Sequence, residues 1–141
     1  MFEKIMVAID GSAHSLKAVE TTIAMAKKAN SKVEIIYVKP VLTHYMRDSA
    51  QMITALEKRI TEEANKIMEE ALAKFKDTGI EYNTSIKKGD AADVIIREAE
   101  EKGIELIVMG SRGLGAISRF VLGSVSSKVL THAPCSVLII R

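Results

Sequence analysis

The amino-acid sequence predicts a single α/β domain built on a parallel sheet with helices on both faces. Short apolar segments alternate with longer segments whose apolar residues recur every three or four positions. Strands buried on both faces form continuous apolar runs, and helices of this length connect parallel strands. The chain has 141 residues, 48% of them apolar, which is enough for one full core. We therefore expect five strands and four helices joined by right-handed crossovers.

The first half of the chain contains two predicted strands and two predicted helices. Residues 5–9 are all apolar and run into turn residues that begin with Asp10, as in a strand buried on both faces. A helix with apolar residues at three- and four-residue spacing follows from Ser12 or Ser15, and residues 33–38 form the next strand. A long helix then carries an apolar stripe that we expect to lie in the core: Met52, Leu56, Ile60, Ala64, Ile67, Met68, Ala71, Leu72 and Phe75.

The second half supplies three more strands and two more helices. The predicted strands are residues 80–86, 104–109 and 137–140, and the predicted helices are residues 90–103 and 124–132. Asp90 has the pattern of an N-cap, with an acidic residue three positions later at Asp93. We expect the charged run at residues 98–102 to be a solvated helix face.

Composition argues against several classes of function. The 20 Lys and Arg residues nearly balance the 18 Asp and Glu, and the six aromatic residues offer few stacking platforms, so we expect no nucleic-acid partner. No apolar run approaches the roughly 20 residues that span a bilayer, so we expect no membrane segment. The single cysteine, Cys135, and the lack of a signal-peptide pattern favour the cytoplasm. The three histidines have no metal spacing, so we expect no metal bound directly by side chains.

A glycine-rich segment follows the strand at residues 104–109. Gly110, Gly113 and Gly123 allow the backbone to approach an anion, and the helix expected from Ser124 adds free N–H groups at its start. This pattern indicates a phosphate-bearing ligand. It is not a Walker loop, because no Gly-Lys-Ser/Thr follows, and it lacks the last glycine of the dinucleotide fingerprint, which disfavours NAD.

Asp10 marks a second strand end with polar residues. In open parallel sheets, ligands bind beyond the carboxyl ends of strands where the winding reverses. If the strands before Asp10 and Gly110 are neighbours, their loops form one cleft. Asp10 is alternatively a turn or capping residue, and Ser124 and Ser126 are alternatively caps of the last helix.

The chain resembles the universal stress proteins along its whole length, residues 1–141, and specifically their ATP-binding branch. That branch has the pattern Gly-x2-Gly-x9-Gly-Ser/Thr, which reads here from Gly110 through Gly113 and Gly123 to Ser124. Residues 7–12 and 133–138 are similar to the first and last strands of the family. The resemblance implies a Rossmann-like, open twisted sheet of the adenine nucleotide alpha hydrolase type, with strand order 3-2-1-4-5.

The resemblance also implies roles for individual residues. Asp10 corresponds to a carboxylate near the ribose and phosphates, and Ile9, which precedes it in the strand, is expected to line the same site. From its charge rather than from the resemblance, we expect Arg112 to add a charge-assisted bond to phosphate, the alternative being a solvated arginine in a surface loop. The remaining implied positions surround the adenine (Ala8, Val38), flank the ribose and phosphates (Met109, Gly110) or form the phosphate cradle (Gly113, Gly123, Ser124, Val125, Ser126).

The resemblance implies an ATP-binding universal stress protein, with Mg²⁺ carried by the phosphates. Nucleotide occupancy would then regulate a stress response through an unknown protein partner. Family members dimerise through their last strand, so we expect a homodimer formed by the edge strand from Val137 to Ile140. One alternative is a slow ATPase or an adenylyl-transfer enzyme on the same scaffold. However, Asp10 is the one general-base candidate near the phosphates, so we expect at most weak ATP hydrolysis. A nucleotide-free dimeric interaction protein is the other alternative, against which the glycine motif argues.

Overall fold

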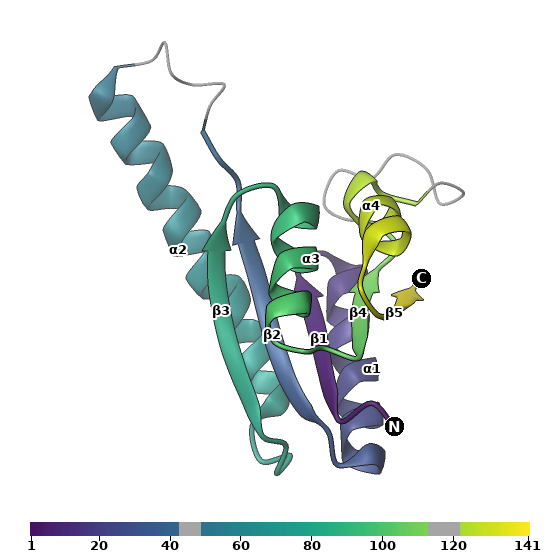
Figure 1. Ribbon diagram of the computed structural model, residues 1–141. Helices are drawn as coiled ribbons and strands as arrows, with labels where there is room; N and C mark the ends of the chain where they lie inside the picture. Colours follow the sequence, from purple (N-terminus) through teal and green to yellow (C-terminus); the bar gives the residue numbers. More distant parts are fainter. Residues whose placement is uncertain (43–48, 113–121) are drawn as a thin grey trace.

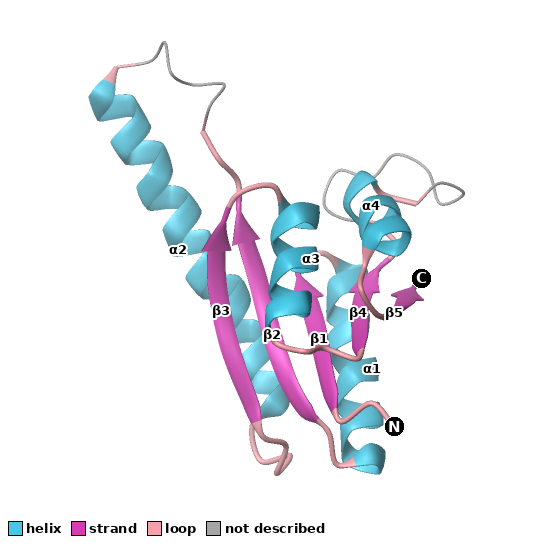
Figure 2. Ribbon diagram, in the orientation of Figure 1, coloured by secondary structure: helices cyan, strands magenta, loops and turns pink. Residues whose placement is uncertain are grey.

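The computed structural model describes residues 1–42, 49–112 and 122–141. The strands in these residues are β1 Lys4–Ile9, β2 Lys32–Lys39, β3 Tyr82–Lys88, β4 Leu106–Gly110 and β5 Ser136–Ile140. The helices are α1 Ala13–Ala29, α2 Ala50–Phe75, α3 Ala91–Glu101 and α4 Ser124–His132. The predicted alternation of strands and helices is confirmed (Figure 2). No helix in the described residues is long and apolar enough to cross a bilayer.

All five strands are parallel and lie in the order β3-β2-β1-β4-β5, as the resemblance implied. Helices α1 and α2 cover one face of the sheet, and α3 and α4 cover the other (Figure 1). This arrangement confirms the predicted α/β sheet with helices on both faces. It also explains the continuous apolar runs of β1 and β4, because both faces of these central strands are buried.

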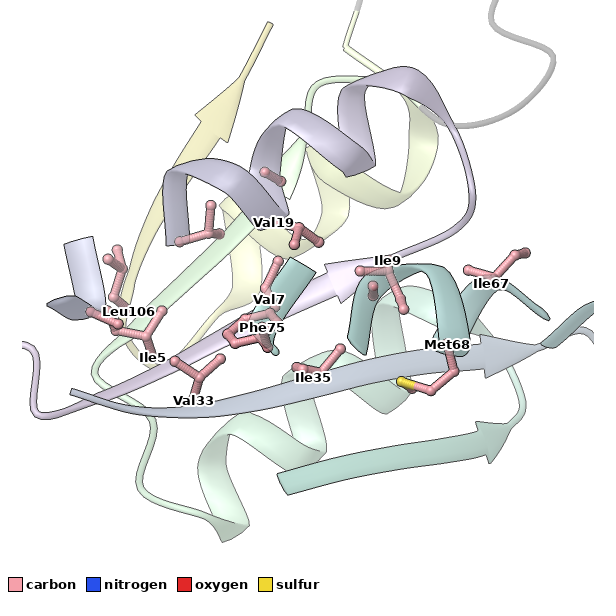
Figure 3. Packing of buried hydrophobic residues seen from close by; sticks show 14 residues of the cluster. Ile5, Val7, Ile9, Val19, Val33, Ile35, Ile67, Met68, Phe75 and Leu106 are labelled. Atoms are coloured by element: carbon pink, nitrogen blue, oxygen red, sulfur yellow. The ribbon is translucent and has the colours of Figure 1, made fainter. Parts of the chain in front are cut away.

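Alternate residues of β1 enter two separate hydrophobic clusters. Ile5, Val7 and Ile9 belong to the cluster under α1 and α2, where Phe75 is the largest fully buried side chain (Figure 3). Met6 belongs to the cluster under α3 and α4. Successive side chains of a strand point to opposite faces, so one apolar run anchors helices on both sides of the sheet.

The first half of α2 corrects the prediction that its whole apolar stripe lies in the core. Met52 is 60% exposed, and Leu56 and Ile60 are only partly buried. Burial on this helix begins at Ala64. The reason is geometric: α2 runs past the ends of the strands, so its first turns have no sheet beneath them (Figure 1).

The position of β3 differs from the prediction as well. The strand begins at Tyr82, two residues later than expected, and pairs with β2 from Val33 to Lys39. Most of its side chains are exposed because it is an edge strand that α2 covers only in part. Tyr82 still packs on Phe75, with ring centroids 5.3 Å apart.

Glu98 shows that the charged run at residues 98–102 is not simply a solvated face. Its side chain is 7% exposed and lies 3.2 Å from Lys87 Nζ and 3.8 Å from Lys102 Nζ. Lys102 also contacts Glu34 at 3.0 Å. A buried carboxylate requires such partners, and they tie α3 to β2 and β3.

Candidate functional site

A cavity of about 420 Å³ lies at the carboxyl ends of β1, β2 and β4. Its other walls come from the turn and first residues of α1 and from the starts of α3 and α4. Each predicted site residue that the structure describes lies in this lining: Ala8, Ile9, Asp10, Val38, Met109, Gly110, Arg112, Gly123, Ser124, Val125 and Ser126. Gly113, the other predicted residue, lies outside the described residues. The fold thus brings residues from distant parts of the sequence to one cavity.

The pairing of β1 with β4 explains why these segments meet. Val7 lies opposite Val108 in parallel register, so Asp10 and Gly110 follow neighbouring strands at the same edge of the sheet. The chain passes from β1 to β2 on one side, whereas β4 lies on the other side of β1. This is the reversal point at which open parallel sheets bind ligands. The described residues at the starts of the two loops, Asp10, Gly110 and Arg112, line one cavity, as expected.

Asp10 combines a turn contact with a place in the cavity wall. Its Oδ1 accepts a 2.8 Å hydrogen bond from the backbone N–H of Ser12, and its own N–H donates to Ser15 Oγ at 3.1 Å. Burial raises the pKa of Tyr37, and the carboxylates of Glu63 and Asp10 raise that pKa further. Asp10 therefore stabilises the turn after β1 and is also a residue of the cavity lining.

The start of α4 forms the opposite wall and carries no side-chain cap. The N-cap is Gly123, which has no side chain to accept from the first N–H groups of the helix. The Ser126 hydroxyl instead donates to the carbonyl oxygens of Ser111 at 2.8 Å and Gly123 at 3.0 Å. The capping alternative for Ser124 and Ser126 is therefore wrong. The first backbone N–H groups of α4, which lack helical acceptors, belong to residues of the cavity wall.

Gly110 has a structural reason to be glycine that the sequence did not reveal. A Cβ built there would lie 2.7 Å from His14 Cβ and 3.0 Å from the backbone carbon of His14. The first turn of α1 therefore packs directly on the end of β4. The missing side chain is required for this close approach, whatever ligand the cavity receives.

Several cavity residues were not among those predicted. Ile36 lies on β2, and Ala91 and Ile95 lie one turn apart on α3. Nothing in the sequence pattern indicates that this helix reaches the ligand cavity. Ser12 and Ser15 complete the wall near Asp10.

The cavity has two chemically different regions. Ala8, Ile36, Val38 and Ile95 give an apolar region, and Met109 adds a further apolar side chain. The polar region contains the start of α4 together with Asp10 and Arg112. No cluster of three or more His, Cys, Asp or Glu side chains in the described part of the chain is arranged to hold a metal ion.

Two solved structures with known ligands are similar to this chain over nearly its full length. One is a universal stress protein in complex with cAMP, 26% identical, with a TM-score of 0.75 and coverage of 99% of this chain and 97% of that one. The other is a universal stress protein family protein of Arabidopsis thaliana with AMP bound, 25% identical, with a TM-score of 0.71 and coverage of 97% and 90%.

Sequence comparison identifies the family. The universal stress protein YxiE of Bacillus subtilis is 36% identical over 148 residues, and the alignment covers 100% of both chains. The model of the universal stress protein family matches residues 1–141, which is every residue of the chain. The chain therefore belongs to the universal stress protein family.

Proposed function

We propose that this chain binds ATP in the cavity, with Mg²⁺ held through the phosphates, and acts as a nucleotide-dependent regulator in stress response. The observation that carries the proposal is the division of the cavity into an apolar region and a region that favours anions. A volume of about 420 Å³ lies within the range of about 300–1,000 Å³ that is usual for ligand sites. The family members solved with cAMP and AMP support an adenine nucleotide as the ligand.

The two regions match the two ends of a nucleotide. Adenine is flat and largely apolar, and it suits the region formed by Ala8, Val38 and Ile95. Phosphates suit the uncapped start of α4, where free N–H groups and the positive end of the helix dipole favour negative charge. Arg112 adds a guanidinium on the same side. The ribose would then lie between them, near Asp10.

The residues of the lining also indicate how Mg²⁺ would be coordinated. A side-chain metal cluster is not present in the described residues, so Mg²⁺ would be coordinated mainly by phosphate oxygens and water. Asp10 is the carboxylate of the lining that could contact such a hydrated ion. The proposal therefore needs no metal bound to the protein before the nucleotide arrives.

We further propose that the protein acts as a homodimer joined through β5. This strand is the last of the sheet beside β4, and Val137, Leu138, Ile139 and Ile140 are all partly exposed. An apolar edge strand pairs readily with a second copy of itself. Light scattering should give the dimer mass at working concentration, and a monomer mass would contradict this part of the proposal.

The identity of the bound ligand can be determined without assuming one in advance. Freshly purified protein is denatured, and the released small molecules are identified by mass spectrometry. We expect an adenine nucleotide, with ATP as the main species. Release of a different phosphorylated compound would replace ATP in the proposal, and a released apolar ligand without phosphate would contradict it.

A further inference from the structure

His14 contacts a cavity residue from outside the predicted site. Its Nε2 lies 3.1 Å from Nη2 of Arg112, although 98 residues separate the two in the sequence. His14 belongs to the first turn of α1, whereas Arg112 follows β4 and lines the cavity. Both side chains are partly buried.

The chemistry of the contact fixes the role of each partner. A guanidinium has donors and no acceptor, so His14 Nε2 must accept and the imidazole must be neutral, with its proton on Nδ1. A protonated imidazole would lose this acceptor and would place a second positive charge beside the guanidinium. The contact therefore holds Arg112 without neutralising its charge, which remains available to an anion.

The backbone around His14 leaves little freedom for this contact to shift. A Cβ at Gly110 would lie 3.0 Å from the backbone carbon of His14 and 3.1 Å from the backbone nitrogen of Ser15. Ser15 is itself fixed, because its N–H donates to Ser12 Oγ and its hydroxyl accepts from the Asp10 N–H. The first turn of α1 is thus a firm support from which His14 reaches the guanidinium.

Arg112 still has hydrogen-bonding capacity beyond this contact. Its Nε is buried and has no hydrogen-bond partner among the described residues. Its backbone lies beside the start of α4, since a Cβ at Gly123 would be 3.4 Å from Arg112 Cα. A guanidinium held on one side by His14, with a helix start beside its backbone, can present its remaining terminal donors to the oxygens of a phosphate.

We propose that His14 is a positioning residue for the phosphate end of the cavity: it holds the Arg112 guanidinium so that affinity depends on the phosphates of the ligand. This inference rests on the proposed nucleotide site. A purely structural tie between α1 and β4 would make a different prediction, because it would affect all ligands of the cavity alike.

The test compares ATP with adenosine by calorimetry, both in the presence of Mg²⁺. His14→Ala should weaken ATP binding about tenfold, the usual effect of losing a hydrogen bond to a charged group, and should change adenosine binding less than about twofold. His14→Gln offers an amide oxygen to Arg112 and should restore most of the ATP affinity. His132→Ala, which removes an exposed histidine at the far end of α4, is the matched control and should change neither affinity.

A double-mutant cycle makes the test specific to Arg112. In an Arg112→Ala background, His14→Ala should cause no further loss of ATP affinity, because the residue that it positions is gone. Three results would overturn the inference and leave the nucleotide proposal standing. The losses of ATP affinity in the two single variants could add in the double variant, His14→Ala could weaken adenosine binding as much as ATP binding, or His14→Ala could leave ATP binding unchanged. If the wild-type protein binds no ATP, the nucleotide proposal fails and this inference fails with it.

Discussion

The hydroxyl of Ser126 donates a 2.8 Å hydrogen bond to the carbonyl oxygen of Ser111, which also accepts the N–H of Gly123 at 2.8 Å. Ser111 follows β4, whereas Ser126 lies in the first turn of α4. Both serines are almost fully buried. One carbonyl group therefore joins the end of a central strand to the start of the helix that forms the opposite wall of the cavity.

Replacing Ser126 with alanine should destabilise this junction moderately. The carbonyls of Ser111 and Gly123 keep their bonds from the N–H groups of Gly123 and Ser127, so no buried acceptor is left without a partner. We expect the free energy of unfolding to fall by about 1 kcal/mol in urea titrations. Ser127→Ala is the control, because Ser127 is an exposed residue of the same helix. It should change the free energy of unfolding by less than about 0.5 kcal/mol. Equal effects of the two substitutions would contradict the junction.

Gly110→Ala tests the close contact between β4 and α1. The added methyl group would meet the Cβ and the backbone of His14, which cannot move without shifting the helix. Overpacking of this kind should lower the free energy of unfolding by about 1–3 kcal/mol. Gly123→Ala is a matched control in the same cavity, since its nearest contact would be 3.4 Å. Thermal unfolding should rank Gly110→Ala as clearly less stable, and the reverse order would show that α1 is not packed as described.

Ser124→Asp should separate stability from phosphate binding. An acidic residue at the start of α4 favours the helix dipole, so stability should be unchanged or slightly higher. The same charge would repel a phosphate in the cavity, and the dissociation constant for ATP should rise about tenfold or more. Ser127→Asp puts an equal charge on an exposed position outside the cavity lining. If both variants weaken ATP binding equally in calorimetry, phosphates do not lie at this helix start.

The N-cap of α3 at Asp90, together with the ion pairs of Lys128 in α4, predicts a dependence of stability on pH. The backbone N–H of Asp93, assisted by Lys128, holds the pKa of the Asp90 carboxyl below its ordinary value of 3.8. Because the pKa is lower in the folded state, the stabilisation is present above pH 3.8 and is lost as pH falls through the folded pKa. Lys128 Nζ lies 2.7 Å from Asp93 Oδ1 and 3.4 Å from Asp90 Oδ2.

Asp90→Asn is the variant that tests this dependence, because asparagine can still cap α3 but carries no charge. The stability advantage of the wild-type protein over Asp90→Asn should be present at about pH 6 and should shrink towards about pH 2. Urea titrations of both proteins at both pH values measure this difference in the free energy of unfolding. An advantage that stays constant over this range would mean that the charge of Asp90 does not contribute.

The parts of the fold that the sequence predicted best are those governed by local pattern. The all-apolar run of β1, the N-cap at Asp90 and the bounds of α4 depend on neighbouring residues, and the structure confirms them. Strand order required the resemblance, because alternating strands and helices fit several orders. The exposed start of α2 and the buried Glu98 depend on which residues the sheet leaves uncovered, and this information is not local.

In the candidate site, too, features set by local pattern were predicted and contacts between distant segments were not. Glycine spacing and strand ends pointed to Asp10 and to the start of α4, and these residues line one cavity. The contact of His14 with Arg112 could not be predicted, because it requires the first turn of α1 to lie on the end of β4. The role of Gly110 in that contact was hidden for the same reason, since a glycine pattern does not reveal which neighbour approaches.

The central claim is that the cavity binds ATP, and a calorimetric titration of the wild-type protein with ATP and Mg²⁺ tests it most directly. We predict one ATP per chain with a dissociation constant between about 1 μM and 1 mM, or about −8 to −4 kcal/mol. Bound nucleotide is removed first, so that the cavity is open to the titrant. Absence of binding up to millimolar ATP would contradict the account.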